Sequence, residues 1–278
     1  MDKFKPTRIC HANVDKSKNI IRYNTKEVVD HSFTMKNVNR YVIDRIPFVY
    51  LRYNDGEWRS LLGREVWDKY WKNTGNGDRH EFYNGMMNDL RSVLDDISKL
   101  DKNKVNIHVG LHGTWDQLEI QNYVVDNNLK DTIHWVGTIR PVEGLWDFSF
   151  LEFLKIIKND KTICKILLTK KTLSPMSKIL NIDHYIPVDH LNSYLKYNEY
   201  FNKCSEICEK ETRPILIMSS IGPSCNILGY RLYEKYNKIM YLNTGCVFDP
   251  FMGFKIRGFM RDPDFIEWFK KHYKEYMP

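Results

Sequence analysis

The sequence predicts an α/β fold in which a mostly parallel sheet is covered by helices on both faces. From residue 45 onward, short apolar runs alternate with segments whose apolar residues recur at helical spacing. Hydrophobic residues make up 42% of the chain and charged residues 28%, a balance typical of globular proteins rather than of disordered or repeat-biased chains. Because parallel strands need long crossover connections, strands that alternate with helices indicate a parallel sheet.

Five elements are expected in the first half of the chain. The run at 46–51 is continuously apolar, as a strand buried on both faces is, and apolar positions then recur with helical period over 83–97. Alternating apolar residues predict a strand over 105–109. A second strand at 133–136 and a helix at 148–157 complete this half.

The second half continues the same alternation. The expected elements, in order, are a strand at 163–168, a helix at 191–208, a strand at 215–218, a helix at 225–236, a strand at 239–242 and a last helix that begins at Asp262-Pro263. Pro is favoured in the first turn of a helix because the N–H that it lacks would be unpaired there anyway. The 278 residues suit a single domain over residues 45–278 that follows a polar, irregular lead-in over residues 1–44.

Charge and segment composition narrow the class of protein. The chain has 42 Lys and Arg residues against 35 Asp and Glu residues, and this net charge of +7 favours anionic partners without choosing among them. Its apolar runs are far shorter than the roughly 20 residues of a membrane span, and its start lacks the apolar core of a secretory signal. We therefore expect a cytoplasmic protein with reduced cysteines, in the host cytoplasm if the Lys/Asn/Ile-rich usage reflects a viral source.

The segment 48–58 carries the most informative motif. A buried strand ends in Arg52, and Asp55 and Glu57 follow it with Gly56 between them. Two carboxylates at a strand's end suit a hard divalent cation such as Mg²⁺ or Mn²⁺, which also bridges the phosphates of a nucleotide. An arginine at the same place suits a phosphate or a carboxylate. The alternative is a surface turn, because Asn-Asp-Gly is common turn chemistry.

A second motif joins the strand at 215–218 to the helix at 225–236. Gly222 and Pro223 open that helix, and the free N–H groups at a helix start favour a phosphate. The hydroxyls of Ser219, Ser220 and Ser224 would add donors. The motif is neither a P-loop nor a GxGxxG fingerprint, and an ordinary strand-to-helix turn is the alternative.

Other strand ends carry further candidates. Asp249 follows the strand at 239–242 and could act as a general base or bind sugar hydroxyls, although an Asp before Pro is also a common turn residue. His108 and His112 flank the end of the strand at 105–109, where they could line a pocket or belong to a partly buried loop. Arg140 follows the strand at 133–136 and is a candidate contact for a phosphate or an acceptor.

Taken in order, these segments resemble the GT-D-type glycosyltransferases, a family of bacterial-type sugar transferases with a Rossmann-like fold. The family carries an arginine followed closely by Gly-Asp-Gly-Glu, and Arg52-Tyr-Asn-Asp-Gly-Glu57 matches it with Asn54 in place of the first glycine. Its Gly-Pro-Ser/Thr turn is matched by residues 222–224, and its strand ending in Asp-Ile-Gly-His corresponds to residues 242–246. The resemblance covers about residues 45 to 255.

The resemblance implies a metal and nucleotide site in which Asp55 and Glu57 hold Mn²⁺ or Mg²⁺. Together with the strand-end candidates, it gives the following donor-binding residues: Arg52, Gly56, Ser219, Ser220, Gly222, Pro223, Ser224, Asn243, Gly245, Arg140 and His112. Asn243 and Cys246 replace the acid and the histidine of the family's Asp-Ile-Gly-His segment. Any acid–base role of that segment therefore does not carry over, and Asp249 is the substitute candidate for a catalytic base.

The leading hypothesis is a metal-dependent hexosyl- or pentosyltransferase. It would move a sugar from a nucleotide sugar, with a UDP-sugar as the expected donor, to a hydroxyl of an oligosaccharide or glycoconjugate, and the cation would neutralise the diphosphate leaving group. A basic nucleic-acid-binding protein is disfavoured because basic and acidic residues are interspersed. Another Rossmann-like transferase, such as a methyltransferase, is disfavoured because no glycine-rich loop occurs early in the chain. The sequence does not specify the sugar, the acceptor, the stereochemical outcome or the oligomeric state.

Overall fold

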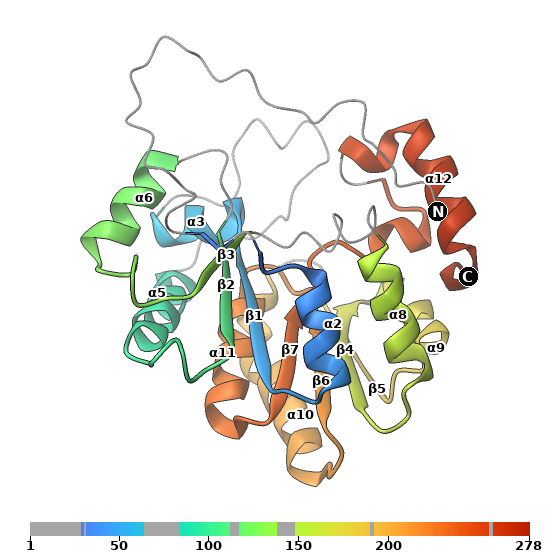
Figure 1. Ribbon diagram of the computed structural model, residues 1–278, viewed down its shortest axis with the longest axis horizontal. Coiled ribbons are helices and arrows are strands. Elements are labelled where there is room, and N and C mark those ends of the chain that lie inside the picture. The colour runs from blue at the N-terminus through green and yellow to red at the C-terminus, as the bar shows by residue number, and fades with distance from the viewer. Residues whose placement is uncertain are drawn as a thin grey trace.

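A single parallel sheet organises the protein (Figure 1). The computed structural model describes residues 29–30, 32–63, 84–111, 117–137, 148–189, 192–255 and 258–278. Within them, seven strands lie in the order β3-β2-β1-β7-β6-β4-β5, and every neighbouring pair is parallel. The predicted Rossmann-like α/β class is confirmed, with a wholly parallel sheet where a mostly parallel one was expected.

The strands fall close to the predicted apolar runs. They are β1 (Phe48–Tyr53), β2 (Ile107–Leu111), β3 (Trp135–Gly137), β4 (Cys164–Lys170), β5 (His184–Val188), β6 (Ile215–Ser219) and β7 (Ile239–Asn243). Every residue of β6 and β7 is buried, because both faces of the sheet are covered at its centre. Of the seven, β5 was not predicted as a strand; it is an edge strand whose first residues are exposed, so it lacks the continuous apolar run of an interior strand.

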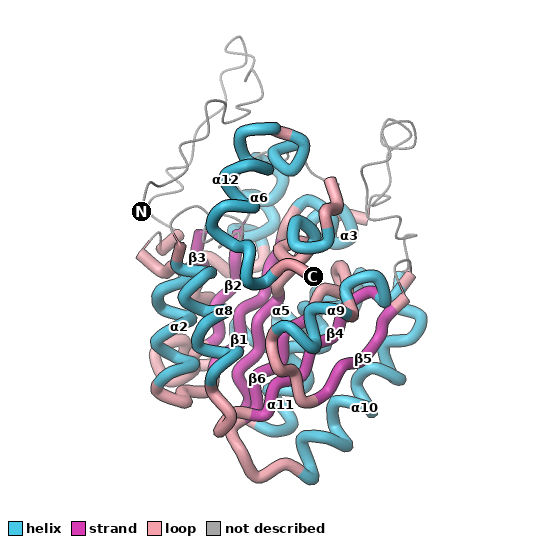
Figure 2. Tube along the Cα trace, turned by 90° about the vertical axis from the view of Figure 1, so that its right-hand side faces the viewer, coloured by secondary structure: helices cyan, strands magenta, loops and turns pink. Residues whose placement is uncertain are grey.

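Helices cover both faces of the sheet (Figures 1 and 2). One face carries α2 (Met35–Ile43), α8 (Ser149–Asn159), α9 (Pro175–Ile179) and α12 (Pro263–Tyr273). The other carries α3 (Asp55–Leu61), α5 (Asn84–Ser98), α6 (Gln117–Asp126), α10 (Tyr197–Lys210) and α11 (Ser224–Tyr236). Short 3-10 turns are η1 (Lys171–Leu173), η2 (Ser193–Lys196), η3 (Asp249–Met252), η4 (Gly258–Arg261) and η5 (Lys274–Tyr276).

The two layers divide each strand by alternation. In β1, Phe48 and Tyr50 point into the core under α2 and α8, whereas Val49, Leu51 and Tyr53 point into the core under α5 and α11. This is the period of two that an extended backbone imposes, and both sets of side chains are apolar because both faces are covered.

The core begins before residue 45, in the segment expected to be an irregular lead-in. Met35, Val38 and Val42 of α2 are buried at helical spacing, while Lys36 and Arg40 between them are exposed. Only one short apolar stripe marks this helix, so the polar composition hides it. Residues 1–28 of the expected lead-in lie outside the described residues.

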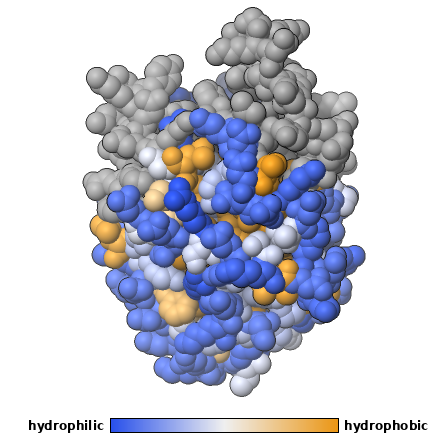
Figure 3. All heavy atoms as spheres, turned by 90° about the vertical axis from the view of Figure 1, so that its left-hand side faces the viewer, coloured by the Kyte–Doolittle hydropathy of each residue, from blue (hydrophilic) through white to orange (hydrophobic). Residues whose placement is uncertain are grey.

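The described surface and cysteines agree with the expectations from composition. Cys164, Cys204, Cys208, Cys225 and Cys246 are free thiols, as predicted, and Cys10 lies outside the described residues. No helix in the described part of the chain is both long and apolar enough to cross a membrane. The face shown in Figure 3 is mostly hydrophilic, with small separate apolar areas.

A chain of partly buried polar side chains ties residues 29–34 to the edge of the sheet. Asp30 forms a bridge to Val136, and its carboxylate lies 3.2 Å from Nε2 of His134. Nδ1 of His134 lies 2.9 Å from Nδ1 of His108, so one ring must donate a proton and the other accept it. Phe33 stacks on the His108 ring with 4.0 Å between ring centroids.

His108 is therefore part of the core and not of a pocket beyond a strand's carboxyl end, which corrects the expectation from sequence. It is the second residue of β2, pairs with Tyr50 of β1 and is 4% exposed. Burial, reinforced by the neighbouring His134, lowers the pKa of His108 to about 3. The ring stays neutral at neutral pH, because a charge in this buried position would lose its hydration.

This lowered pKa predicts a loss of stability in mild acid. In the unfolded chain a histidine has a pKa near 6.5 and binds a proton as the pH falls below that value. Folded His108 binds its proton only near its pKa of about 3. Between these two values protonation favours the unfolded state, so stability is lost as the pH falls. His108→Phe should reduce the difference in unfolding free energy between pH 7 and pH 4.5 by about 2–3 kcal/mol. Urea titrations at both pH values measure this difference. His272→Phe, at a partly exposed histidine of α12, is the control, and an unchanged difference in His108→Phe would contradict the prediction.

Candidate functional site

The candidate site lies where β1 and β7 separate at the carboxyl edge of the sheet. The two strands pair at Phe48–Met240, Val49–Tyr241 and Tyr50–Leu242, but β1 continues to Tyr53 without further pairing to β7. From β1 the chain passes outward to β2 and β3 on one side, and β4 to β7 fill the other side. Ligands of open parallel sheets bind at such a switch of direction, outside the carboxyl ends of the strands.

The side chain of Asn226 fills the gap between the separating strands. Its Oδ1 accepts a hydrogen bond from the Arg52 amide at 2.9 Å, and its Nδ2 donates to the Arg52 carbonyl at 2.7 Å. In a parallel strand both of these groups would otherwise bond to the neighbouring strand. Asn226 is completely buried in the first turn of α11, so one carboxamide replaces the missing β7 residue opposite Arg52.

The same carboxamide reaches the loop after β7. Asn243 donates from Nδ2 to Oδ1 of Asn226 at 3.0 Å, and Oδ1 of Asn243 accepts from the Gly245 amide at 3.2 Å. Asn243 thus stands where the resembled family has an acid, and here its amide holds the strand end and the loop in register. The sequence named Asn243 as a donor contact, and the structure places it directly beneath the loop.

Arg52 packs against that loop. A Cβ built on Gly245 would come within 1.6 Å of Nη1 of Arg52, and Gly245 has a φ of +53°. Only glycine leaves room for the guanidinium and adopts this backbone without strain. The structure therefore brings together two residues that the sequence named separately, Arg52 and Gly245.

The guanidinium of Arg52 is incompletely paired. Its Nε is buried and has no hydrogen-bond partner among the described residues. A buried donor without a partner costs about 1–3 kcal/mol, and an anion bound beside it would remove that cost. Arg52 is thus a cation held by its backbone at the switch point with a donor to spare.

Glu57 lies in the first turn of α3, where a polar turn was expected. Its Oε2 accepts a hydrogen bond from the Asn54 amide at 2.9 Å, as in a capping box, and the residue is 8% exposed. Its negative charge, together with burial, raises the pKa of Tyr53 well above the usual range. A buried carboxylate is therefore fixed at the end of β1, close to the site.

The helical backbone changes how Asp55 and Glu57 are arranged. In an extended segment two residues separated by one would share a face, but in a helix their positions lie about 200° apart around the axis. Asp55 is the first residue of α3, and its side chain lies outside the described part of the structure. Gly56, between them, is partly exposed.

The turn from β6 into α11 lies beside the loop after β7. The Ser220 hydroxyl lies 2.7 Å from that of Thr244, and the Thr244 amide donates to the Ser219 carbonyl at 2.9 Å. Gly222 has a φ of +62°, which lets the chain turn into the helix. The turn and the loop are thus one hydrogen-bonded unit.

Within this turn, burial divides the predicted donor contacts. Ser219 and Ser224 are completely buried, and Pro223 is buried too. Oγ of Ser224 lies 3.2 Å from Oγ of Ser193, which donates to the Ile221 carbonyl at 2.6 Å. Ser219 and Ser224 therefore hold the turn together in this conformation, and Ser220 and Gly222 are the members that reach the surface.

Asp249 is bound to a cation of the chain itself. Its Oδ1 lies 2.7 Å from Nζ of Lys170 at the end of β4, and Asp249 is 3% exposed. Nζ of Lys170 also lies 4.6 Å from the centre of the Phe254 ring. This pair ties the loop after β7 to the end of β4, and it gives the candidate base a structural task that the sequence did not indicate. Neither His112 nor Arg140 lies within the described residues.

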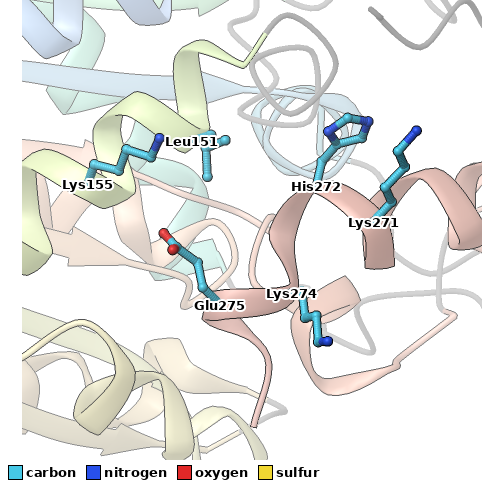
Figure 4. Close-up of a pocket in the computed structure, with 6 residues that line it drawn as sticks. All are labelled: Leu151, Lys155, Lys271, His272, Lys274 and Glu275. Carbon is cyan, nitrogen blue, oxygen red and sulfur yellow. The ribbon is translucent and has the colours of Figure 1, made fainter. Parts of the chain in front are cut away.

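A hollow between α8 and η5 lies apart from these residues (Figure 4). It is lined by Leu151, Lys155, Lys271, His272, Lys274 and Glu275. Figure 4 shows the Glu275 carboxylate on the side of Lys155, while Lys274 points away from the hollow. Its charges do not converge on one point, so we do not assign it to the site.

Asn226 is the functional residue that sequence reasoning missed. A signal for it existed, because an amide stands in a run of small and apolar residues from Cys225 to Tyr230 that is buried all around the helix. A polar residue at such a position needs buried partners. The strand end that supplies those partners is 174 residues away in sequence, so the run alone cannot identify them.

Comparisons with known proteins give a likeness in fold. No family model matches the sequence, and no curated protein matches it. The chain is similar to a solved domain of unknown function 1792 described as having a distinct glycosyltransferase fold, with a TM-score of 0.51, 10% identity and 79% of each chain covered. It is also similar to a glycosyltransferase of the same group (DUF1792) from Streptococcus sanguinis, with a TM-score of 0.51, 14% identity, and 77% of this chain and 81% of that chain covered.

Removing the Asn226 carboxamide should destabilise the fold. Asn226→Ala leaves the amide and the carbonyl of Arg52 buried without partners, and we expect a loss of about 2–5 kcal/mol in unfolding free energy. Urea denaturation followed by circular dichroism measures it. Asn198→Ala, at an exposed position of α10, is the control and should change stability by less than about 0.5 kcal/mol. Equal stability of the two variants would show that the bridge between the strands is not needed.

Proposed function

We propose that this protein is a glycosyltransferase that uses a nucleotide sugar, with a UDP-sugar as the expected donor. The observation that carries the proposal is the Arg52 guanidinium, which packs on Gly245 at the switch point and whose buried Nε has no partner in the part of the chain that the structure describes. The likeness in fold to DUF1792 glycosyltransferases supports it. The acceptor would be a hydroxyl of an oligosaccharide or glycoconjugate.

The charge that develops during sugar transfer explains why an arginine is needed. As the glycosidic bond breaks, the diphosphate leaving group gains negative charge, and a fixed cation beside it stabilises the transition state. A planar guanidinium suits phosphate oxygens because it offers parallel donors. Asn226 fixes the backbone of Arg52 and Gly245 supports its side chain, so little reorganisation is required on binding.

Neighbouring groups would complete the donor site. Ser220 offers a hydroxyl near the surface, and Gly222 lies at the start of α11, where helix N–H groups favour phosphate. Gly245 would let a ligand approach the backbone. The buried Ser219 and Ser224 would act through the shape of the turn.

The metal assignment rests on the chemistry of the first turn of α3. Glu57 offers a hard oxygen donor of the kind that Mn²⁺ and Mg²⁺ prefer, and Asp55 lies two residues before it. A cation bound in this turn would take one of the two carboxylates as its ligand, since α3 places their positions about 200° apart, and it would supply further neutralisation of the diphosphate. In this proposal Asp249 remains the candidate base, and it would act from its ion pair with Lys170.

Shortening Arg52 should impair catalysis far more than stability. We expect Arg52→Ala to lower turnover of a UDP-sugar by roughly 10²–10³-fold, because a fixed cation is lost from the leaving group. Arg52→Lys should recover only part of the rate, since an ammonium lacks the planar fork. Measurements of nucleotide release and sugar transfer test this, with Arg40→Ala on the exposed side of α2 as the control. Wild-type turnover in Arg52→Ala would refute the proposed donor site.

A single substitution at Glu57 separates the metal role from the capping role. Glu57→Gln keeps an oxygen that can accept from the Asn54 amide but removes the charge, so we expect unfolding free energy within about 0.5 kcal/mol of wild type and a loss of Mn²⁺-dependent donor binding. Calorimetric titration of UDP with and without Mn²⁺ measures the binding. Glu206→Gln on exposed α10 is the matched control. Full Mn²⁺ dependence in both Glu57→Gln and Asp55→Asn would exclude the two carboxylates as ligands.

A further inference from the structure

Three side chains able to bind a metal meet at the amino edge of the sheet, at the opposite ends of the strands from the candidate donor site. They are Cys164, the first residue of β4, His184, the first residue of β5, and Glu211, which directly follows α10. One possible ligand atom from each lies within 4.8 Å of the other two. They come from segments far apart in sequence, so the fold itself brings them together.

The register of the sheet explains the meeting. His184 pairs with Ile166 of β4, and Cys164 precedes Ile166 by two residues, so Cys164 and His184 are diagonal neighbours on the same face. This is the face covered by α10, whose buried Cys204 and Cys208 pack in the same core cluster as Cys164. Because α10 ends above the first residues of β4, Glu211 lies next to Cys164 and His184.

The carboxylate of Glu211 is held in place by an outer layer of charged groups. Arg213 donates from Nε to Oε1 at 3.1 Å and from Nη2 to Oε2 at 2.7 Å. Nη1 of Arg213 donates to Asp183 at 3.0 Å, and Asp183 also accepts from the Lys165 amide at 2.9 Å. These bonds fix the position and orientation of the Glu211 carboxylate. Outer partners of this kind orient metal ligands.

The other two groups differ in exposure in a way that suits entry of an ion. Cys164 is completely buried, whereas His184 lies at the surface, and no hydrogen bond or ion pair engages the His184 ring among the described residues. An ion arriving from solvent would meet the imidazole first. A cluster that only satisfies the hydrogen bonds of its polar groups would explain the contacts between Glu211 and Arg213. It would not explain why the His184 ring lies beside them.

We propose that Cys164, His184 and Glu211 bind a zinc ion. One thiolate, one imidazole and one carboxylate are a mixed S/N/O set that suits Zn²⁺ and not the oxygen-preferring Mg²⁺ or Mn²⁺, and water would take the fourth tetrahedral position. Binding replaces the thiol proton, which is released to solvent, so that sulfur enters as thiolate. In a tetrahedral zinc site the ligand atoms are roughly 3.4–3.8 Å apart, so the three must close in by about 1 Å. The exposed His184 side chain is the one free to move.

Zinc here would fasten one edge of the sheet. β5 is an edge strand, paired on one side only with β4, and its first two residues are not buried. A zinc ion would join β4, β5 and the end of α10 at one point. The site is structural in this proposal and does not depend on the proposed glycosyltransferase activity.

Cobalt substitution tests the proposal on the full-length, reduced and metal-free protein. We expect one equivalent of Co²⁺ to produce a thiolate-to-cobalt charge-transfer band, and one equivalent of Zn²⁺ to abolish it and raise the melting temperature. Cys164→Ala should remove the band, and His184→Ala and Glu211→Gln should each weaken Zn²⁺ binding by at least tenfold. Cys246→Ala, at a thiol in the loop after β7, should leave band and affinity unchanged.

His184→Ala decides the matter if Cys164→Ala fails to fold, because His184 is exposed and its loss leaves the core intact. Absence of stoichiometric Co²⁺ binding, or wild-type affinity in His184→Ala, would overturn the proposal. Glu57→Gln should bind Zn²⁺ as wild type does, so failure of the zinc site and failure of the proposed donor site are separate results.

Discussion

The carboxamide of Asn226 is the constraint on which the rest of the carboxyl edge depends. A parallel sheet opens for a ligand only if two neighbouring strands separate, and separation leaves an amide and a carbonyl of the inner strand without partners in the core. Asn226 satisfies both groups of Arg52 and also binds Asn243. The opening is therefore stable without any ligand, and the residues around it are positioned before a substrate arrives.

This arrangement gives the positive charge of the chain a specific place. The net charge of +7 alone describes any basic protein. At the switch point, however, Arg52 carries a donor that has no partner among the described residues, while Lys170, at the end of β4, is neutralised by Asp249. Of these two cations at strand ends, Arg52 is thus the one available to an anion, and the net charge of the surface contributes only long-range attraction.

The sheet was predictable from sequence and the site only in part, for a physical reason. Strands such as β6 and β7 are buried on both faces, so each is a continuous apolar run that can be recognised from its own residues. Asn54, Asp55 and Gly56 predict a turn because each of these residue types favours turns. The chain instead enters α3, because the Glu57 side chain accepts a hydrogen bond from the Asn54 amide, and residue propensities do not include that contact. Asn226, Lys170 and His108 acquire their roles from partners that are distant in sequence, and no local pattern contains those partners.

The two edges of the sheet differ in chemistry because they solve different problems. At the carboxyl edge the strand ends present an arginine and a glutamate, which suit phosphate and hard cations that must bind and leave during turnover. At the amino edge a buried thiol, an imidazole and an arginine-held carboxylate surround one point, which suits a softer ion that stays. Because thiolate and imidazole select Zn²⁺ while an all-oxygen set selects Mn²⁺ or Mg²⁺, the two sites would not compete for one metal. The two proposals together place a donor site and a zinc site at opposite ends of the strands of one parallel sheet.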